Sequence, residues 1–295
     1  MEYIGSAEAA KKWGVSERSV RNYCATGRVS GALRLGKSWL VPSDAQKPTR
    51  ANGRAANENA LLSRLRMEKA ASLPGGIYHR VQIDLTYNSN HIEGSTLSYE
   101  QTRLIFETNT LAPDGPVSTD DLVETSNHFR CVDMIIDNAN RELTQHLIKQ
   151  LHATLKAGTS DSRKSWFAVG DYKRLPNEVG GMLTAPPSTV HIAMADLLEE
   201  YEREDTHSFD DLLDFHYRFE RIHPFQDGNG RVGRLILFKE CLRNGMVPFI
   251  IGDDLKLFYY RGLQEWEHER GFLRDTCLTA QDRFKELLDG FEIAY

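Results

Sequence analysis

The segment that most constrains the fold is 209–245, which reads as two helices separated by a glycine-rich turn. Apolar residues recur at helical spacing in FDDLLDFHYRFERI and again in RVGRLILFKECLRNG, which closes at Asn244 and Gly245 as helices commonly do. Between these apolar faces, HPFQDGNGRVGR puts one imidazole, one carboxylate, two guanidiniums and three glycines into twelve residues. A turn that leads into a helix N-terminus is a general way to hold an anion, because unpaired backbone N–H groups point at it.

The glycines and arginines of this turn suit a phosphate. Gly228 and Gly230 have no side chain in the way, so backbone N–H groups can approach a phosphate closely. Arg231 and Arg234 are three residues apart and lie on the same side of the second helix. Their guanidiniums can therefore bind further phosphate oxygens.

Two other side chains add the means for group transfer. Asp227 offers a hard oxygen ligand for Mg²⁺, and His223 is a residue type suited to general base catalysis near neutral pH. The combined spacing favours transfer from a nucleoside triphosphate to a hydroxyl over the alternative, a capped helix turn with solvated charges.

The first fifty residues differ in charge from the rest of the chain. They carry nine Lys and Arg against four Asp and Glu, whereas the remainder carries 27 against 38. A basic head on an acidic body predicts that the head meets a polyanion while the body does not.

Two short helices are expected in this head. Ser6 with Glu8, and Ser16 with Glu17, are typical cap and first-turn residues, and Gly14 lies between the two segments. The following stretch, TGRVSGALRLGKSWLVPSD, reads as a small hairpin or wing that ends at Pro42.

This layout resembles the excisionase and MerR-like winged helix-turn-helix families over residues 2–48. The resemblance implies duplex DNA binding, with the second helix in the major groove and the wing on the backbone. The candidate DNA contacts are Arg18, Arg21, Asn22 and Lys37. The alternative is a small protein-binding module of the same shape. We predict a winged helix-turn-helix domain at 1–50 and a linker with a connecting helix at 51–75.

The remainder, 76–295, is expected to be one mainly α domain, because most of its segments have helical spacing. HPFQDGNGRVGR resembles the signature of the Fic family, HxFx(D/E)GNGRxxR, at every fixed position. The matching residues are His223, Phe225, Asp227, Gly228, Asn229, Gly230, Arg231 and Arg234. The resemblance covers roughly 76–290 and implies a mostly helical fold whose members transfer AMP from ATP to Ser, Thr or Tyr hydroxyls.

The resemblance also implies roles for the matching residues. His223 would deprotonate the target hydroxyl, and Asp227 would bind Mg²⁺. Arg231 and Arg234 would hold the outer phosphates, with Arg234 on the γ-phosphate. The remaining ATP ligands would be Asn229 and the amides of Gly228 and Gly230.

Two flanking segments are similar to further parts of the family's site. LPNEVGGMLTAPPSTVHI reads as a hairpin at about 177–191 and looks like the target-docking flap, which aligns a peptide by strand addition; an ordinary surface hairpin is the alternative. The flap residues would be Val179, Gly180, Gly181, Met182, Leu183 and Thr184. LFYYRGLQEWE resembles the nucleotide-side helix, with Tyr260 near the base or ribose. Glu267 stands where Asn is common, so ATP and another nucleotide both stay open.

The segment SNHIEG places Ser89 and Glu93 four residues apart, on one face if helical, and Gly94 follows as a stop. It is similar to the family's inhibitory motif (S/T)xxxE(G/N), in an inhibitory helix at about 82–95. The resemblance implies that Glu93 pairs with Arg234, competes with the γ-phosphate and keeps basal activity low. The alternative is an ordinary capped helix end.

The sequence thus predicts a self-inhibited protein adenylyltransferase that uses ATP and Mg²⁺. Two alternatives stay open: a nucleotide-sensing transcription regulator, and a Fic-type enzyme that removes AMP from a modified target. The partners expected are a protein substrate, which can be the chain itself, and double-stranded DNA; a homodimer is compatible with the sequence. No apolar run approaches the roughly 20 residues of a membrane-spanning helix, so we expect a cytoplasmic protein without a membrane partner. Its four scattered cysteines are expected to be buried free thiols.

Overall fold

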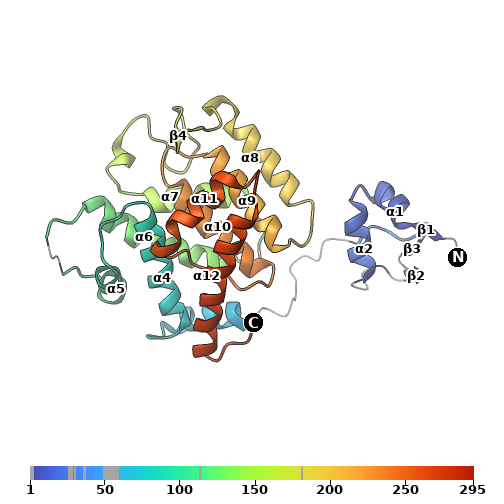
Figure 1. Cartoon of the computed structure of the whole chain (residues 1–295), viewed down its shortest axis with the longest axis horizontal. Helices are drawn as coiled ribbons and strands as arrows, with labels where there is room; N and C mark the ends of the chain where they lie inside the picture. Colours follow the sequence, from blue (N-terminus) through green and yellow to red (C-terminus); the bar gives the residue numbers. More distant parts are fainter. Residues whose placement is uncertain are drawn as a thin grey trace. The chain divides into compact units, whose positions relative to one another are not determined.

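The computed structural model describes residues 3–25, 29, 31–35, 38–48, 60–112, 115–180 and 182–295, apart from the side chains of residues 18, 22, 25, 35 and 182. The chain forms two compact units, which are described separately below. One comprises Met1–Arg54 with Glu200–Thr206, and the other comprises Ala55–Glu199 with His207–Tyr295 (Figure 1).

The N-terminal unit combines two helices with a three-stranded antiparallel sheet in the order β1-β3-β2. Its elements are β1 (Tyr3–Gly5), α1 (Ser6–Trp13), α2 (Glu17–Ala25), β2 (Leu33–Leu35) and β3 (Ser38–Pro42). Gly14 ends α1 with a φ of 66°, which glycine adopts without the clash that a Cβ causes. Apolar residues of both helices, of β3 and of the segment between α2 and β2 form a core of their own: Ala9, Ala10, Trp13, Val20, Tyr23, Cys24, Val29 and Val41.

Two details of this unit differ from the sequence prediction. Strand β1 was not predicted; it is only three residues long and forms by pairing with β3. Ser6 is not a cap but the first residue of α1, and its hydroxyl donates to Glu17 Oε1 at 2.7 Å. Of the DNA-contact candidates, Arg21 is exposed and pairs with Glu17 at 2.6 Å. The side chains of Arg18 and Asn22, and all of Lys37, lie outside the described residues.

The second unit is mainly α, as predicted. Its longer helices are α3 (Ala60–Ala71), α4 (Ile77–Ile92), α5 (Tyr99–Thr108), α6 (Thr119–Asp137), α7 (Gln145–Lys156), α8 (Pro187–Tyr201), α9 (Phe209–Ile222), α10 (Asn229–Arg243), α11 (Lys256–Glu265) and α12 (Gly271–Gly290). Two 3₁₀ turns, η1 (Asp161–Arg163) and η2 (Asp253–Leu255), and a hairpin of β4 (Glu178–Val179) and β5 (Met182–Leu183) complete it. No helix in the described part of the chain is both long and apolar enough to span a bilayer. The four cysteines, Cys24, Cys131, Cys241 and Cys277, are free and buried, as expected.

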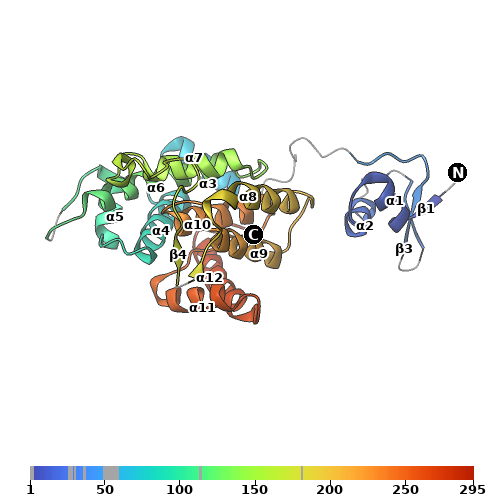
Figure 2. The same ribbon diagram turned by 90° about the horizontal axis from the view of Figure 1, so that it is seen from above.

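Helix α10 lies at the centre of this unit, where it packs against α4, α6, α7 and α9 (Figures 1 and 2). Only Gly230 and Arg243 of its 15 residues escape burial. A helix that is buried all round has little freedom to shift. The N-terminus of α10, which follows the glycine-rich turn, is therefore held in a fixed position.

The hairpin is shorter than predicted. β4 and β5 pair only Glu178 with Leu183 and Val179 with Met182. Residues 187–191, which the sequence assigned to the hairpin, form the first turn of α8. Pro187 explains the difference, because its fixed φ and missing N–H suit the first position of a helix. Leu183 at the hairpin is 77% exposed.

Candidate active site

His223 ends α9 and begins the loop to α10. It adopts the left-handed conformation with a φ of 50°, and its N–H donates to Phe219 O at 2.9 Å. This backbone state is uncommon for a residue with a Cβ and is held here by the surrounding contacts. Burial, with a further contribution from the Lys173 ammonium, lowers the pKa of His223 to about 4. The imidazole is therefore neutral near pH 7, as a general base must be.

The loop between the two helices is locked by Asn229. Its Oδ1 accepts from Phe225 N at 2.7 Å and its Nδ2 donates to Phe225 O at 2.8 Å. The Phe225 ring stacks on His152 of α7 with centroids 4.0 Å apart. The side chain of Asn229 thus sets the shape of the loop. Gly228 has a φ of 81°, and a Cβ there would lie 3.3 Å from Leu155, so this turn favours glycine.

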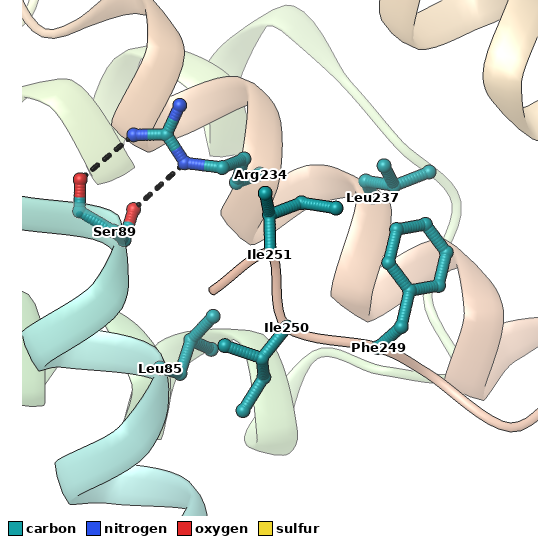
Figure 3. Close-up of a pocket in the computed structure, with 7 residues that line it drawn as sticks. All are labelled: Leu85, Ser89, Arg234, Leu237, Phe249, Ile250 and Ile251. Atoms are coloured by element: carbon teal, nitrogen blue, oxygen red, sulfur yellow. Dashed lines mark hydrogen bonds between the residues drawn. The ribbon is translucent and has the colours of Figure 1, made fainter. Parts of the chain in front are cut away.

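Arg234 is buried and faces the end of α4. Its Nε donates to Ser89 Oγ at 3.1 Å and its Nη2 to Ser89 O at 2.8 Å, both drawn in Figure 3. The same Nη2 lies 2.7 Å from Glu93 Oε1. Burial opposes the charge of Arg234, but the Glu93 carboxylate outweighs it and raises the pKa. Besides Ser89 and Arg234, the small pocket in Figure 3 is lined by Leu85, Leu237, Phe249, Ile250 and Ile251.

The Glu93 carboxylate lies against the first turn of α10. A Cβ added to Gly230 would fall 2.3 Å from Glu93 Oε1 and 2.9 Å from Arg234 Nη1. The first turn of a helix is where free N–H groups and the helix dipole favour an anion. Glu93 thus lies beside the place that the sequence assigns to phosphate.

Arg231 is also buried but has different partners. Its Nη2 lies 3.1 Å from Asp227 Oδ2, and its Nη1 contacts Glu124 of α6. The same Asp227 oxygen accepts from Lys156 Nζ at 2.6 Å. Lys156 in turn contacts Glu124 and Asp161, the latter at 3.1 Å. Burial would raise the pKa of Asp227, but Arg231 and Lys156 outweigh it and hold this pKa far below its usual range.

Asp227 fits a Mg²⁺ site in which phosphate oxygens and water supply most of the ligands. Its side chain is 47% exposed, and both cationic partners use the same oxygen. The described residues contain no cluster of three or more His, Cys, Asp or Glu side chains that could hold a metal. Mg²⁺ commonly takes one or two carboxylates together with phosphate oxygens and water, so a single aspartate beside a phosphate site is sufficient.

Several residues of the site were not predicted. Glu124 and Lys156 carry the charge network around Arg231, yet neither belongs to a motif or a spacing that would mark it in the sequence. Glu220 lies one turn before His223, and a Cβ on Gly233 would fall 2.4 Å from its Oε1. Burial raises the pKa of Glu220 to about 8, so the side chain is largely protonated at neutral pH.

The two residues expected at the nucleotide side form hydrogen bonds to different helices, α4 and α9. Tyr260 is 40% exposed, and its hydroxyl donates to Ile92 O at 3.4 Å, next to Glu93. Glu267 lies beyond the end of α11, and its Oε1 accepts from the Tyr217 hydroxyl of α9 at 2.7 Å.

A histidine at the end of one helix, a glycine-rich turn and two buried arginines on the next helix characterise the second unit, which has the fold of Fic proteins. It is similar to the crystal structure of a Fic-domain-containing signaling protein from Bacteroides thetaiotaomicron, with a TM-score of 0.59 and 28% identity over 79% of this chain and 92% of the other. It also resembles Fic-1 from C. elegans, with a TM-score of 0.62 and 20% identity over 79% and 71% of the chains, which shows the fold alone.

The sequence comparisons agree with the fold. Residues 142–240 match the family model described as the Fic/DOC family. Over 186 residues the chain is 31% identical to the protein adenylyltransferase Fic of Drosophila mojavensis, which covers 60% of this chain. The chain spans about a third, 35%, of that relative's length. These likenesses support the Fic family for the second unit.

Proposed function

We propose that the second unit is a protein adenylyltransferase that transfers AMP from ATP to a Ser, Thr or Tyr hydroxyl of a protein, which can be the chain itself. The observation that carries the proposal is a neutral, partly buried histidine beside a helix N-terminus that presents two buried arginines. The likeness to protein adenylyltransferases supports the same reaction.

In the proposed reaction the His223 imidazole accepts the proton of the target hydroxyl. The hydroxyl oxygen forms a bond to the α-phosphorus while the bond from that phosphorus to the bridging oxygen breaks, and pyrophosphate leaves. The backbone amides at Gly228 and Gly230 and the dipole of α10 would stabilise the phosphate charge. Arg231 and Arg234 would hold the outer phosphates. Mg²⁺ on Asp227 would supply further positive charge beside them.

The proposal includes self-inhibition by Glu93. Its carboxylate uses an Arg234 nitrogen and lies against Gly230, so it competes with the γ-phosphate for the same donors. ATP that binds without Arg234 would have its α-phosphorus out of line with the attacking hydroxyl. Basal transfer should therefore be slow.

The test is transfer of label from α-labelled ATP into whole lysate and into the chain itself. Glu93→Gly should increase labelling, and adding His223→Ala should abolish it. Unchanged labelling in Glu93→Gly would refute the inhibitory role. Label from the γ position should not be transferred, so γ-label on protein would mean kinase chemistry instead. Loss of AMP from a prelabelled target that depends on Glu93 would indicate the removal reaction.

We also propose that the N-terminal unit binds duplex DNA. Two short helices joined at Gly14, with a three-stranded sheet behind them, support this proposal, as does the positive charge of the first fifty residues. The assay is binding to a pool of random-sequence duplex DNA fragments with and without ATP. DNA binding that responds to ATP, with no label transfer even in Glu93→Gly, would favour a nucleotide-sensing regulator over a transferase.

A further inference from the structure

Lys173 joins the hairpin to the loop that carries His223. Its side chain is buried, and its ammonium donates to three acceptors. Two lie at the base of the hairpin, Asn177 Oδ1 at 2.7 Å and Thr184 Oγ1 at 2.6 Å. The third is Ile222 O at 3.3 Å. Ile222 is the last residue of α9 and directly precedes His223. All three ammonium hydrogens are thus used to connect the two segments.

Neighbouring hydrogen bonds reinforce this connection. Lys173 N donates to Pro224 O at 2.9 Å, and Leu175 N donates to Gln226 Oε1 at 3.2 Å. Asn177 Nδ2 donates to Phe225 O at 3.0 Å. Because these bonds follow one another along the two segments, they hold the hairpin base and the loop at 222–226 together.

The charge of Lys173 is not neutralised locally. Its acceptors are two carbonyl oxygens and a hydroxyl, and in the described part of the chain it forms no ion pair with a carboxylate. Burial lowers the pKa of Lys173 to about 8, so the side chain is still mostly charged at pH 7.

The groups that act on the His223 imidazole oppose one another. The Lys173 ammonium disfavours a second positive charge nearby, in the same sense as burial. The Glu220 carbonyl of α9, Glu93 at the end of α4 and Asp227 of the loop favour it. The outcome is a neutral imidazole, so burial and Lys173 prevail over the two carboxylates.

We propose that Lys173 is a positioning residue of the active site, which ties the target-docking hairpin to the catalytic loop and keeps the His223 imidazole uncharged. Removal of this one side chain should both loosen the hairpin and let His223 take up a proton at a higher pH than in the wild-type chain. The inference rests on the proposed function for its link to the target, but its effect on His223 can be measured without any reaction.

The test follows the His223 imidazole by NMR in the full chain with labelled histidine, between pH 5 and pH 8, with His223→Ala to assign the signal. In the wild-type chain the signal should keep its neutral position throughout. In Lys173→Met its midpoint should rise by about one pH unit or more, into the measured range.

Lys149→Met is the matched control. Lys149 Nζ pairs with Asp171 at 2.7 Å and lies 4.2 Å from the Tyr172 ring centroid, so it is a lysine beside the same segment that does not bond the loop at 222–226. Its replacement should leave the His223 titration unchanged. Lys173→Arg, which keeps the charge, should also keep His223 neutral down to pH 5.

The activity arm uses the Glu93→Gly background, so that the reaction is measurable. In Lys173→Met the rate of AMP transfer should fall at acidic pH, and KM for the protein target should rise. Lys173→Arg should keep the pH profile and change only KM.

A folded Lys173→Met chain whose His223 titrates as in the wild type would overturn the inference. If circular dichroism shows that this variant does not fold, Lys173→Gln, which keeps a donor but no charge, takes the same measurement with the same two outcomes. If no variant transfers AMP but the His223 midpoint moves, the proposed function fails while the positioning role of Lys173 stands.

Discussion

The two arginines of α10 have the same charge and nearly the same burial, with side chains 6% and 5% exposed for Arg231 and Arg234, but their partners differ. Arg231 faces Glu124, which lies within α6 and also holds Lys156. Arg234 faces Glu93, which follows the last residue of α4. One pair lies inside a network of helices, and the other ends on a residue at a helix terminus.

From this difference we infer that Glu124 on Arg231 forms a structural ion pair, here called the anchor, and that Glu93 on Arg234 forms a displaceable one, here called the switch. Glu124 is 13% exposed and contacts two buried cations, so its displacement would leave Arg231 with Asp227 alone and Lys156 with Asp227 and Asp161. Glu93 is 29% exposed and contacts one, and the Ser89 oxygens would still accept from Arg234 if Glu93 moved away. Competition by a γ-phosphate is therefore expected at Arg234 and not at Arg231.

The largest effect is expected from removing the anchor. Glu124→Gln should lower the free energy of unfolding by about 2–3 kcal/mol, because two buried cations each lose one of their carboxylate partners. It should not increase AMP transfer. The measurement is urea unfolding, with Glu100→Gln as control. Glu100 pairs with Arg103 at the surface, so its change should stay below about 1 kcal/mol. An equal decrease in the free energy of unfolding in both variants would show that Glu124 stabilises the fold no more than a surface ion pair does.

Removal of the switch should act on rate instead. Glu93→Gln keeps the shape of the side chain but loses its charge, so Arg234 becomes available to the γ-phosphate. We expect the initial rate of AMP transfer to rise about 10- to 100-fold, which corresponds to about 1.4–2.7 kcal/mol. Thermal unfolding of the same variant should change much less than that of Glu124→Gln. A large loss of stability without faster transfer would make Glu93 a second anchor.

A third prediction concerns Glu220, whose buried carboxyl interacts electrostatically with Arg234. In the folded chain its pKa is raised to about 8 by burial, whereas a glutamate in the unfolded chain ionises near pH 4.5. Folding therefore takes up a proton between these values, and the stability contributed by the carboxyl falls as pH rises from about 4.5 to 8.

Glu220→Gln, which is neutral at every pH, should match the wild type near pH 4.5 and gain stability over it by up to about 1.4 kcal/mol for each pH unit between pH 4.5 and 8. The measurement is urea unfolding at both pH values. Asp161, a carboxyl in the charge network around Arg231, behaves in the opposite way to Glu220. Lys164 and Lys156 lower the pKa of Asp161 in spite of burial. A stability difference that does not depend on pH would show that Glu220 is ionised in the folded chain.

The sequence predicted the helices around the motif well, for local reasons. In α9, Leu212, Phe215 and Phe219 recur at helical spacing and are buried, and the Ser208 side chain caps the helix start. The proximity of Glu93 to Arg234 was also expected, but only because SNHIEG resembles a known motif. Spacing alone could not place residues that are 141 positions apart.

The sequence could not predict the buried lysines. Lys156 ends a helix whose apolar face is Leu147, Leu151 and Leu155, and a lysine at such a place reads as solvent-exposed. It is 2% exposed because Glu124, Asp161 and Asp227 come from three other segments. Lys173 is similar, since its acceptors are a distant backbone carbonyl and two polar side chains. Burial of this kind is decided by tertiary packing and leaves no local pattern.

The smallest effect that still separates the two arginines is the preference for ATP over ADP. In the wild-type chain Glu93 holds Arg234, so the γ-phosphate gains little and the two nucleotides should bind within about twofold of each other. In Glu93→Gly, ATP should bind about 5- to 10-fold tighter than ADP, a difference of about 1.0–1.4 kcal/mol measured by calorimetry. Adding Arg234→Ala should erase this preference, because no guanidinium remains for the γ-phosphate. Glu124→Gln should not create it. A wild-type chain that already prefers ATP to the same degree would show that Glu93 leaves Arg234 accessible, and the contrast between the two arginines would then be one of packing alone.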